Sequence, residues 1–350
     1  MEEFEKRVLK VINKYNLIQE KDKIVLGVSG GPDSIAMLES LYQIKTNNKI
    51  DFEICVAHIN HGIRENAKID EQFVLDFCKE RNIECYVLHS KVLELAKDEK
   101  RGVEETGRKV RYEFFNEIME KTNSNKIAIA HNKKDNVETI IMNVLRGSGV
   151  TGLCGIEPIS GVYIRPLICE NREDIEIYLK QKNIIPRIDE SNFENEYTRN
   201  KIRNIVIPYV EKEFNPNIIE TITRLSEIIK ADNEYLKKVT KEKYKEILVK
   251  KQNITNKQLQ NSEKNVYNED ELPTIILDLK KFNELENVLQ KRIILIAISE
   301  LFGTTQGIEK VHIDDIIKLC NKNIGNKFLT PNKRTKIVIK NKKIYIIAKE

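Results

Sequence analysis

The 350-residue sequence lacks three features that would each point to a particular class of protein. Its longest apolar run, residues 293–298, is far below the roughly 18 residues that span a bilayer. Its six cysteines form no Cys-x-x-Cys pair, which favours free thiols in a reducing compartment. Its first five residues are mostly acidic and do not resemble a signal peptide. We therefore expect a cytoplasmic protein with no membrane partner.

A large excess of one charge is also missing. The chain has 59 Lys and Arg residues against 54 Asp and Glu residues, a net charge of +5. This mildly basic balance permits an RNA partner without requiring one. The length is sufficient for two or three domains.

The most informative segment present is a hexapeptide between an apolar run at 24–28 and a helical pattern at 35–42. It consists of Ser29, Gly30, Gly31, Pro32, Asp33 and Ser34. This order predicts a strand, a glycine-rich loop and a helix, an arrangement that holds phosphate on backbone N–H groups and a helix N-terminus. The alternative is a tight turn whose helix is capped by Asp33 or Ser34. The segment has no Walker-type lysine.

Strands and helices are predicted to alternate through the first half of the chain. Strands are expected at 52–59, 83–88 and 126–130, and helices at 4–15, 70–79, 105–121, 137–145 and 172–182. This rhythm predicts an α/β fold with a parallel, doubly wound sheet. Since ligands of such sheets lie beyond the carboxyl ends of the strands, the hexapeptide, His58 and His131 should meet in one crevice.

The pattern changes near residue 216 and becomes mainly helical. Helical patterns cover about 218–249, 281–301 and 309–320, residues 252–270 are polar, and runs at 336–339 and 344–347 predict a hairpin. We therefore divide the chain into a catalytic domain at 1–213, a helical accessory domain at 214–325 and a hairpin-like segment at 326–350.

Two further blocks follow predicted strands or begin a predicted helix. Residues 57–64 contain Arg64 and two histidines, His58 and His61. The segment either shapes a nucleotide pocket or, if a third ligand joins the two histidines, holds zinc. Residues 104–112 contain Arg108 and Arg111, which share a helical face by their spacing. These arginines either clamp phosphate or form a solvated basic face.

The next block, residues 131–149, places Asp135 and Glu138 three residues apart at a helix start and ends near Arg146. Both carboxylates can face one site and hold Mg²⁺ or a substrate ammonium. Alternatively, Asp135 is the N-cap and Glu138 its capping-box partner. Both interpretations remain compatible with the sequence.

The last block contains Arg199, Lys201 and Arg203 within residues 197–204, before an apolar helical pattern. Such a concentration of cations and amides is typical of a phosphate- or RNA-facing element. The alternative is an ordinary basic helix start, which the helix dipole would disfavour.

The hexapeptide resembles the PP-loop of the N-type ATP pyrophosphatases. Together, the five blocks resemble the tRNA(Ile)-lysidine synthetase family in order and spacing over about residues 20–210. The resemblance implies that ATP, with Mg²⁺, adenylates the wobble cytidine in the CAU anticodon of tRNA(Ile). Free L-lysine then attacks C2 of this cytidine, forming lysidine and releasing AMP in addition to the earlier pyrophosphate.

The resemblance also implies roles for individual residues. The hexapeptide, His58 and His131 would bind ATP, and Asp33 would contact Mg²⁺ and act in catalysis. Asp135 and Glu138 would hold or deprotonate lysine. The arginines and lysine expected to act on phosphate or tRNA are Arg64, Arg108, Arg111, Arg146, Arg199, Lys201 and Arg203, with Arg108 and Arg111 assigned to catalysis.

Two departures from the family pattern are visible. Lys134 precedes Asp135 where family members often carry a second aspartate, and the chain ends where longer members continue into another domain. Two other functions stay open: an ATP-dependent tRNA thiolase, which the missing Cys-x-x-Cys pair disfavours, and a non-catalytic tRNA-binding protein. A homodimer is possible.

Overall fold

The computed structural model describes residues 1–60, 62, 67–187, 198–254, 272–321 and 327–349. The chain divides into two compact units, Met1–Lys230 and Ala231–Glu350. The division lies within one long helix, beyond the boundary expected after residue 213. No helix in the described ranges has the length and apolarity needed to cross a bilayer.

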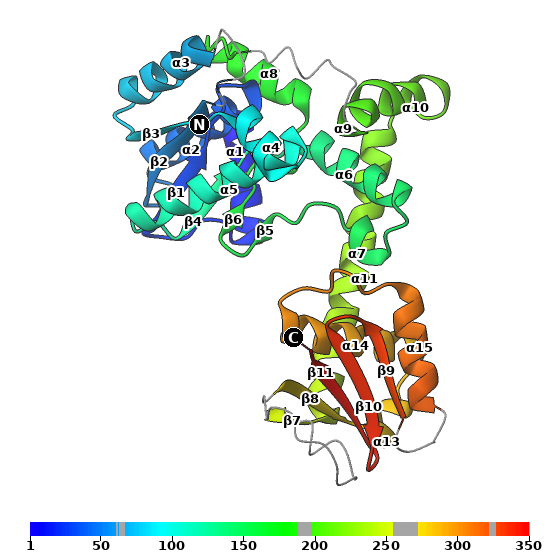
Figure 1. The fold of residues 1–350 in the computed structure, drawn as a ribbon. Coiled ribbons are helices and arrows are strands. Elements are labelled where there is room, and N and C mark those ends of the chain that lie inside the picture. Colours follow the sequence, from blue (N-terminus) through cyan, green and yellow to red (C-terminus); the bar gives the residue numbers. More distant parts are fainter. Residues whose placement is uncertain (61, 63–66, 188–197, 255–271, 322–326, 350) are drawn as a thin grey trace. The chain divides into compact units, whose positions relative to one another are not determined.

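The first unit is built on a six-stranded sheet with the order β3-β2-β1-β4-β6-β5 (Figure 1). Its pairs are parallel except that of β5 with β6. The strands are β1 (Asp22–Gly27), β2 (Phe52–Asn60), β3 (Cys85–His89), β4 (Lys126–Ile129), β5 (Ile159–Ser160) and β6 (Tyr163–Ile164). The expected parallel α/β architecture is confirmed.

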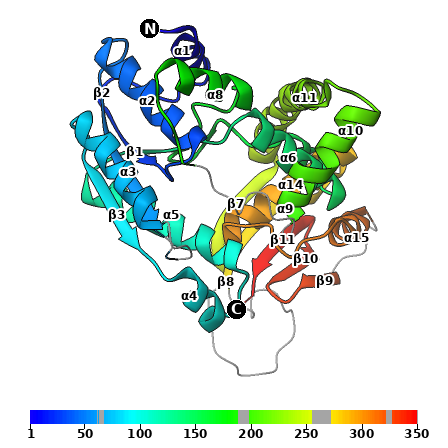
Figure 2. The ribbon, with the colours of Figure 1, turned by 90° about the horizontal axis from the view of Figure 1, so that it is seen from above.

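Helices cover both faces of this sheet, as the doubly wound pattern predicts. The helices of this unit are α1 (Glu3–Tyr15), α2 (Pro32–Thr46), α3 (Ala67–Glu80), α4 (Val92–Glu99), α5 (Val103–Lys121), α6 (Lys133–Leu145), α7 (Val150–Leu153), α8 (Arg172–Gln181), α9 (Thr198–Lys201), the π-helix η2 (Ile202–Val206), α10 (Ile207–Glu213) and the first part of α11 (Ile218–Ile247). Of these, α6, η2, α10 and the start of α11 share a small apolar cluster of their own instead of covering the sheet. Figure 2 shows α1, α2 and α8 lying together. Alternate residues of β1 separate the two layers: Leu26 packs in the core of α1, α2 and α8, and Val25 packs with α5.

The close packing of α5 on β1 depends on Gly27. A Cβ atom at this position would clash with the ring of Phe115, most closely with its Cζ. The Gly27→Ala variant is therefore expected to lose about 1–3 kcal/mol of unfolding free energy, because the strand or the helix must shift. Urea denaturation followed by circular dichroism measures this loss.

Gly102→Ala is the matched control, since no atom lies within 4 Å of a Cβ there. Gly102 is the N-cap of α5, so its replacement is expected to cost about 1 kcal/mol or less. Adding Phe115→Leu to Gly27→Ala removes the clashing ring atom and should recover part of the loss. Equal losses in both alanine variants would contradict the packing argument.

The second unit contains a five-stranded antiparallel sheet with the order β7-β8-β11-β10-β9. Its strands are β7 (Leu248–Ile254), β8 (Leu272–Asp278), β9 (Lys327–Asn332), β10 (Thr335–Lys340) and β11 (Lys343–Ala348). Strands β10 and β11 form the expected hairpin, which pairs with β8 and so is part of the larger sheet. Both edge strands have irregular register, between Leu248 and Lys250 in β7 and opposite Thr335 and Ile337 in β9.

Helices pack on one face of this second sheet. They are the end of α11, α13 (Leu279–Asn283), α14 (Asn287–Phe302) and α15 (Lys310–Asn321). Ile293 and Ile316 from the helices share a core with Ile337 and Ile346 from the sheet. The helical segments expected after residue 216 are confirmed, and the sheet that joins them adds β7, β8 and β9 to the expected hairpin.

Candidate functional site

The hexapeptide forms the loop between β1 and α2, beyond the carboxyl end of the strand. Ser34 ties the loop together: its Oγ accepts a hydrogen bond from the backbone N–H of Ser29 at 3.1 Å and donates to the carbonyl of Gly31 at 2.9 Å. Gly30 has a φ of +89°, which residues with a side chain rarely adopt. Its carbonyl accepts from the backbone N–H of Arg187 at 3.0 Å. The loop is therefore fixed before any ligand binds.

The N-terminus of α2 is open to an anion. Its N-cap is Gly31, and no side-chain cap bonds its first turn in the described chain, so neither Asp33 nor Ser34 acts as the cap. Pro32 occupies the first turn, where the N–H it lacks has no helical partner. The remaining N–H groups of the first turn stay available for an anionic ligand.

The carboxylate of Asp33 is held by two side chains from other elements. Nδ2 of Asn132 donates to its Oδ1 at 3.0 Å, and Nη1 of Arg172 donates to its Oδ2 at 2.6 Å. Burial raises the pKa of Asp33 above its ordinary value, and the charge of Arg172 opposes this shift. Arg172 and Asn132 were not among the predicted site residues. The basic Arg172 in the first turn of α8, where the dipole disfavours it, was a signal that could have found it.

Asp135 lies in the first turn of α6 and forms a capping box with Asn132. The side chain of Asn132 accepts from the backbone N–H of Asp135 at 3.0 Å, and the carboxylate of Asp135 accepts from the backbone N–H of Asn132 at 3.0 Å. The N-cap is therefore Asn132, with Asp135 as its partner, instead of Asp135 with Glu138. Glu138 lies one turn further, and its side chain is 0% exposed.

Two arginines of α9 and η2 bind both carboxylates. Arg199 contacts Glu138 Oε2 through Nε and Asp135 Oδ1 through Nη2, each at 3.0 Å. Arg203 contacts Glu138 Oε1 through Nε at 2.6 Å and Asp135 Oδ1 through Nη2 at 2.9 Å. Burial would lower the pKa of Arg203, but the hydrogen bond and charge of Glu138 raise it above its ordinary value. We call Asp135, Glu138, Arg199 and Arg203 the acid–arginine quartet.

His131, at the end of β4, lies beside this quartet. Its Nδ1 accepts from Nε of Arg165 at 3.2 Å. Burial lowers the pKa of His131 to about 4, and the charges of Arg199, Arg165 and Arg108 add to this effect while Asp135 opposes it. His131 is therefore neutral at physiological pH.

His58, at the end of β2, is also buried and neutral. Its Nδ1 lies 2.9 Å from the carbonyl oxygen of Val28, next to the hexapeptide, and burial lowers its pKa. His61, the possible second zinc ligand, lies outside the described residues. The described chain contains no group of three or more side chains suited to a metal ion.

Arg108 and Arg111 lie on α5 with exposed side chains. Nη2 of Arg108 donates to Oη of Tyr112 at 3.3 Å, and its guanidinium lies 5.0 Å from the centre of that ring. Its charge contributes to the lowered pKa of His131. The two arginines therefore lie beside the site, and none of their described hydrogen bonds or ion pairs reaches the quartet.

The remaining predicted residues are not part of this cluster. Arg146 is the C-cap of α6, about 16 Å along the helix from Asp135 at 1.5 Å per residue, and it is exposed. Lys201 is exposed on α9. Arg64 lies outside the described residues, as do the polar residues 189–192 and most of the segment 252–270.

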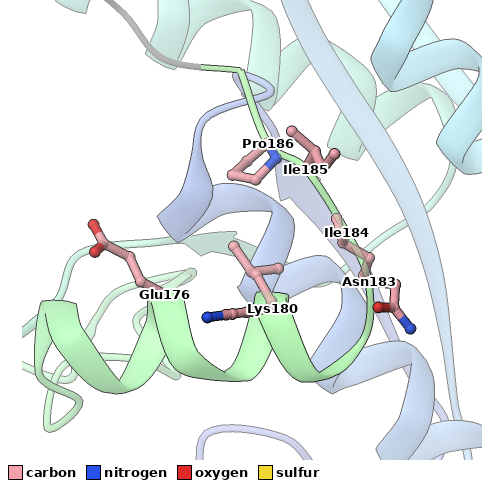
Figure 3. Close-up of a pocket in the computed structure, with 7 residues that line it drawn as sticks. Glu176, Lys180, Asn183, Ile184, Ile185 and Pro186 are labelled. Atoms are coloured by element: carbon pink, nitrogen blue, oxygen red, sulfur yellow. The ribbon is translucent and has the colours of Figure 1, made fainter.

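A shallow cavity of about 410 Å³ lies at the end of α8 (Figure 3). It is lined by Glu176, Leu179, Lys180, Asn183, Ile184, Ile185 and Pro186. None of the predicted site residues lines it. The chemistry-bearing groups are concentrated instead around the hexapeptide and the quartet.

Comparisons with known proteins identify the family of the chain. The model of the PP-loop domain family matches residues 1–210. A tRNA(Ile)-lysidine synthase of Clostridium acetobutylicum is 40% identical over 328 residues, which cover 93% of this chain and 66% of that protein. One of Clostridium tetani is 37% identical over 345 residues, which cover 98% and 69%. The chain thus spans about two thirds of the length of these relatives.

A solved structure shares the fold. It is a U34-tRNA thiolase from Methanococcus maripaludis, with a TM-score of 0.54 and 19% identity over 65% of this chain and 79% of that chain. At this identity the likeness concerns the fold alone, whereas the family model gives the PP-loop domain and the sequence relatives give the narrower group. The chain belongs to the PP-loop domain family and, within it, to the tRNA(Ile)-lysidine synthase family.

Proposed function

We propose that the chain is a ligase that joins L-lysine to C2 of the wobble cytidine in the CAU anticodon of tRNA(Ile). The C2 carbonyl oxygen of cytidine attacks the α-phosphate of ATP, and pyrophosphate leaves. The side-chain amine of lysine then attacks C2 and expels AMP, forming lysidine. One observation carries this proposal: Asn132 joins the hexapeptide to the quartet. Its side chain bonds Asp33, at the open N-terminus of α2, and it also caps α6, the helix that carries Asp135 and Glu138.

The β1–α2 loop supports the use of ATP. The backbone N–H groups of the first turn of α2 and the hydroxyls of Ser29 and Ser34 provide donors for phosphate oxygens. Asp33 supplies a hard oxygen ligand at the same place, and Mg²⁺ in nucleotide sites is commonly held by one or two carboxylates together with phosphates. Asp33 would therefore hold the ion, which would neutralise charge on the leaving pyrophosphate.

The quartet supports lysine as the nucleophile. A lysine side chain attacks only as the neutral amine, so a group must take up its proton, and Asp135 and Glu138 are the carboxylates available for this. Because Arg199 and Arg203 occupy both carboxylates in the described structure, an incoming ammonium would share these oxygens with the guanidinium groups. The same arginines then face substrate phosphate.

Basic residues around the site support tRNA as the partner. Arg108 and Arg111 would act near the quartet, and the exposed Arg146 and Lys201 would contact backbone phosphates further out. A role for Arg64 belongs to the same proposal. The proposal also includes a cytoplasmic site of action, where tRNA and ATP occur together, and a possible homodimer.

The test is a labelled-lysine assay with the protein, ATP, Mg²⁺ and an unmodified tRNA(Ile) transcript. We expect one lysine to enter each tRNA with release of one AMP and one pyrophosphate. A transcript whose wobble cytidine is replaced by uridine is the matched control and should accept no lysine. Binding of ATP and tRNA without lysine incorporation would contradict the proposal. In a parallel reaction with a labelled sulfur donor in place of lysine, sulfur incorporation would identify a thiolase instead.

A further inference from the structure

Arg165 and His131 meet at the carboxyl ends of two neighbouring strands, β6 and β4. The guanidinium of Arg165 is anchored by its neighbours: Nη1 donates to the carbonyl of Glu157 at 2.7 Å, and Nε donates to Nδ1 of His131 at 3.2 Å. Arg165 is only 8% exposed. A buried arginine that is bonded to the backbone and to Tyr112 as well as to an imidazole is suited to hold that imidazole in one state.

The chemistry of the two groups determines where the proton of His131 lies. A guanidinium has donors only, so the Nδ1 atom that faces Arg165 must be an acceptor and carry no proton. Since burial lowers the pKa of His131 to about 4, the ring is neutral at physiological pH and has one N–H. That N–H is therefore on Nε2.

His58 has the opposite arrangement. Its Nδ1 faces the carbonyl oxygen of Val28, which can only accept, so the single proton of this neutral ring is on Nδ1. Nε2 of His58 is then an acceptor. The site thus contains two neutral histidines of different tautomers, one offering a donor and the other an acceptor.

We propose that Arg165 is a positioning residue that fixes His131 as the Nε2–H tautomer, so that His131 donates a hydrogen bond to an oxygen of the bound substrates. The acceptor is a phosphate oxygen of ATP or a carbonyl oxygen of the target base, both of which have free lone pairs. This role of His131 rests on the proposed function, whereas the tautomer itself does not. A neutral donor suits this position because it leaves the charge balance of the quartet unchanged.

The first test is ¹⁵N NMR of the imidazoles in the full chain at neutral pH, with signals assigned from His131→Asn and His58→Asn variants. We expect His131 to show the Nε2–H pattern and His58 the Nδ1–H pattern. In Arg165→Met, His131 should become a mixture of tautomers while His58 stays unchanged as the internal reference. Arg165→Lys, which keeps a charged donor, should retain the wild-type pattern.

An Nδ1–H pattern for His131 in the wild-type protein would overturn the proposal, even if Arg165→Met does not fold. So would an unchanged pattern in a folded Arg165→Met variant. These outcomes do not depend on activity, so they are distinguishable from failure of the lysine assay. A non-hydrolysable ATP analogue and a CAU anticodon stem-loop are then added in separate samples. The substrate that shifts the Nε2 signal of His131 is the one that provides the oxygen. No shift with either substrate would overturn the donor role.

The second test is the rate of AMP release at saturating substrates. Loss of an outer positioning contact typically lowers activity by 10- to 100-fold, and we expect about this loss in kcat for Arg165→Met. Arg165→Lys should recover most of it. Arg7→Met is the matched control, since Arg7 binds Glu170 at 2.8 Å but contacts no site residue in the described bonds. Equal losses in Arg165→Met and Arg165→Lys would argue against a positioning role.

Discussion

Replacement of Asp33 by asparagine is expected to slow AMP release by about two to three orders of magnitude. Asparagine keeps the size of the side chain and an oxygen for Asn132, but it removes the negative charge that would hold Mg²⁺ and that now binds Arg172 at 2.6 Å. Affinity for tRNA should change little, because the loop is expected to act on ATP. Single-turnover AMP formation and tRNA filter binding measure the two effects.

Glu176→Gln is the matched control for this variant. Glu176 is the other carboxylate bound to Arg172, through Nε at 2.8 Å, and it is exposed. Its replacement changes the surroundings of Arg172 without touching Asp33, so near-normal AMP release is expected. Normal turnover by Asp33→Asn would show that the assignment of the hexapeptide to ATP binding is wrong. A large loss of AMP release in Glu176→Gln would mean that the effect of Asp33→Asn arises from the disturbed Arg172.

Replacement of Glu138 by glutamine is expected to lower the free energy of unfolding by about 3–5 kcal/mol. The side chain is 0% exposed and accepts three hydrogen bonds from Arg199 and Arg203. Glutamine leaves two partly buried guanidinium groups with a single carboxylate, that of Asp135. Chemical denaturation of the full chain measures the loss, and lysine incorporation should fall with it.

Glu220→Gln provides the same substitution at an exposed ion pair in the same unit. Glu220 binds Lys133 at 2.7 Å and is 49% exposed. Exposed pairs of this kind contribute about 0–1 kcal/mol, so little change is expected. Similar stability of the two variants would mean that the quartet contributes no more than a surface pair.

The sequence was sufficient to predict that the candidate site residues follow strands of one parallel sheet. The order of apolar runs and helical patterns predicted the parallel sheet, and parallel strands place the hexapeptide, His58 and His131 at one edge. The conflict between basic residues and the helix dipole near residue 199 also predicted a special role for Arg199 and Arg203. Their bonds to Asp135 and Glu138 show how that conflict is resolved.

The pairing itself was not predictable from local patterns. Arg203 and Glu138 are 65 residues apart, and Arg172 is 139 residues from Asp33. Each contact depends on how distant helices are placed, and a single sequence contains no signal for that placement. The two groups were therefore predicted as separate lysine-binding and tRNA-binding sets, whereas the structure joins them.

Local cues also failed in the second unit. Strand β8 was missed because Pro273 lies within its apolar run, a residue that argues against an interior strand. The structure accommodates it because its partner in the ladder, Asn253, lies near the end of the edge strand β7, where one missing N–H donor costs little. The hairpin at 335–348 was predicted because each of its strands contains a short β-like run without proline, at 336–339 and 344–347.

The irregular register of β7 and β9 has a consequence for the behaviour of the protein in solution. Edge strands present unpaired backbone groups that can recruit the sheet of another molecule and start aggregation. Here both edges carry a bulge-like shift, β7 adds Lys250 and Lys251, and β9 contains Pro331. Each of these features hinders the addition of a further strand. We therefore expect the second unit to resist edge-to-edge polymerisation at the high concentrations used for binding studies.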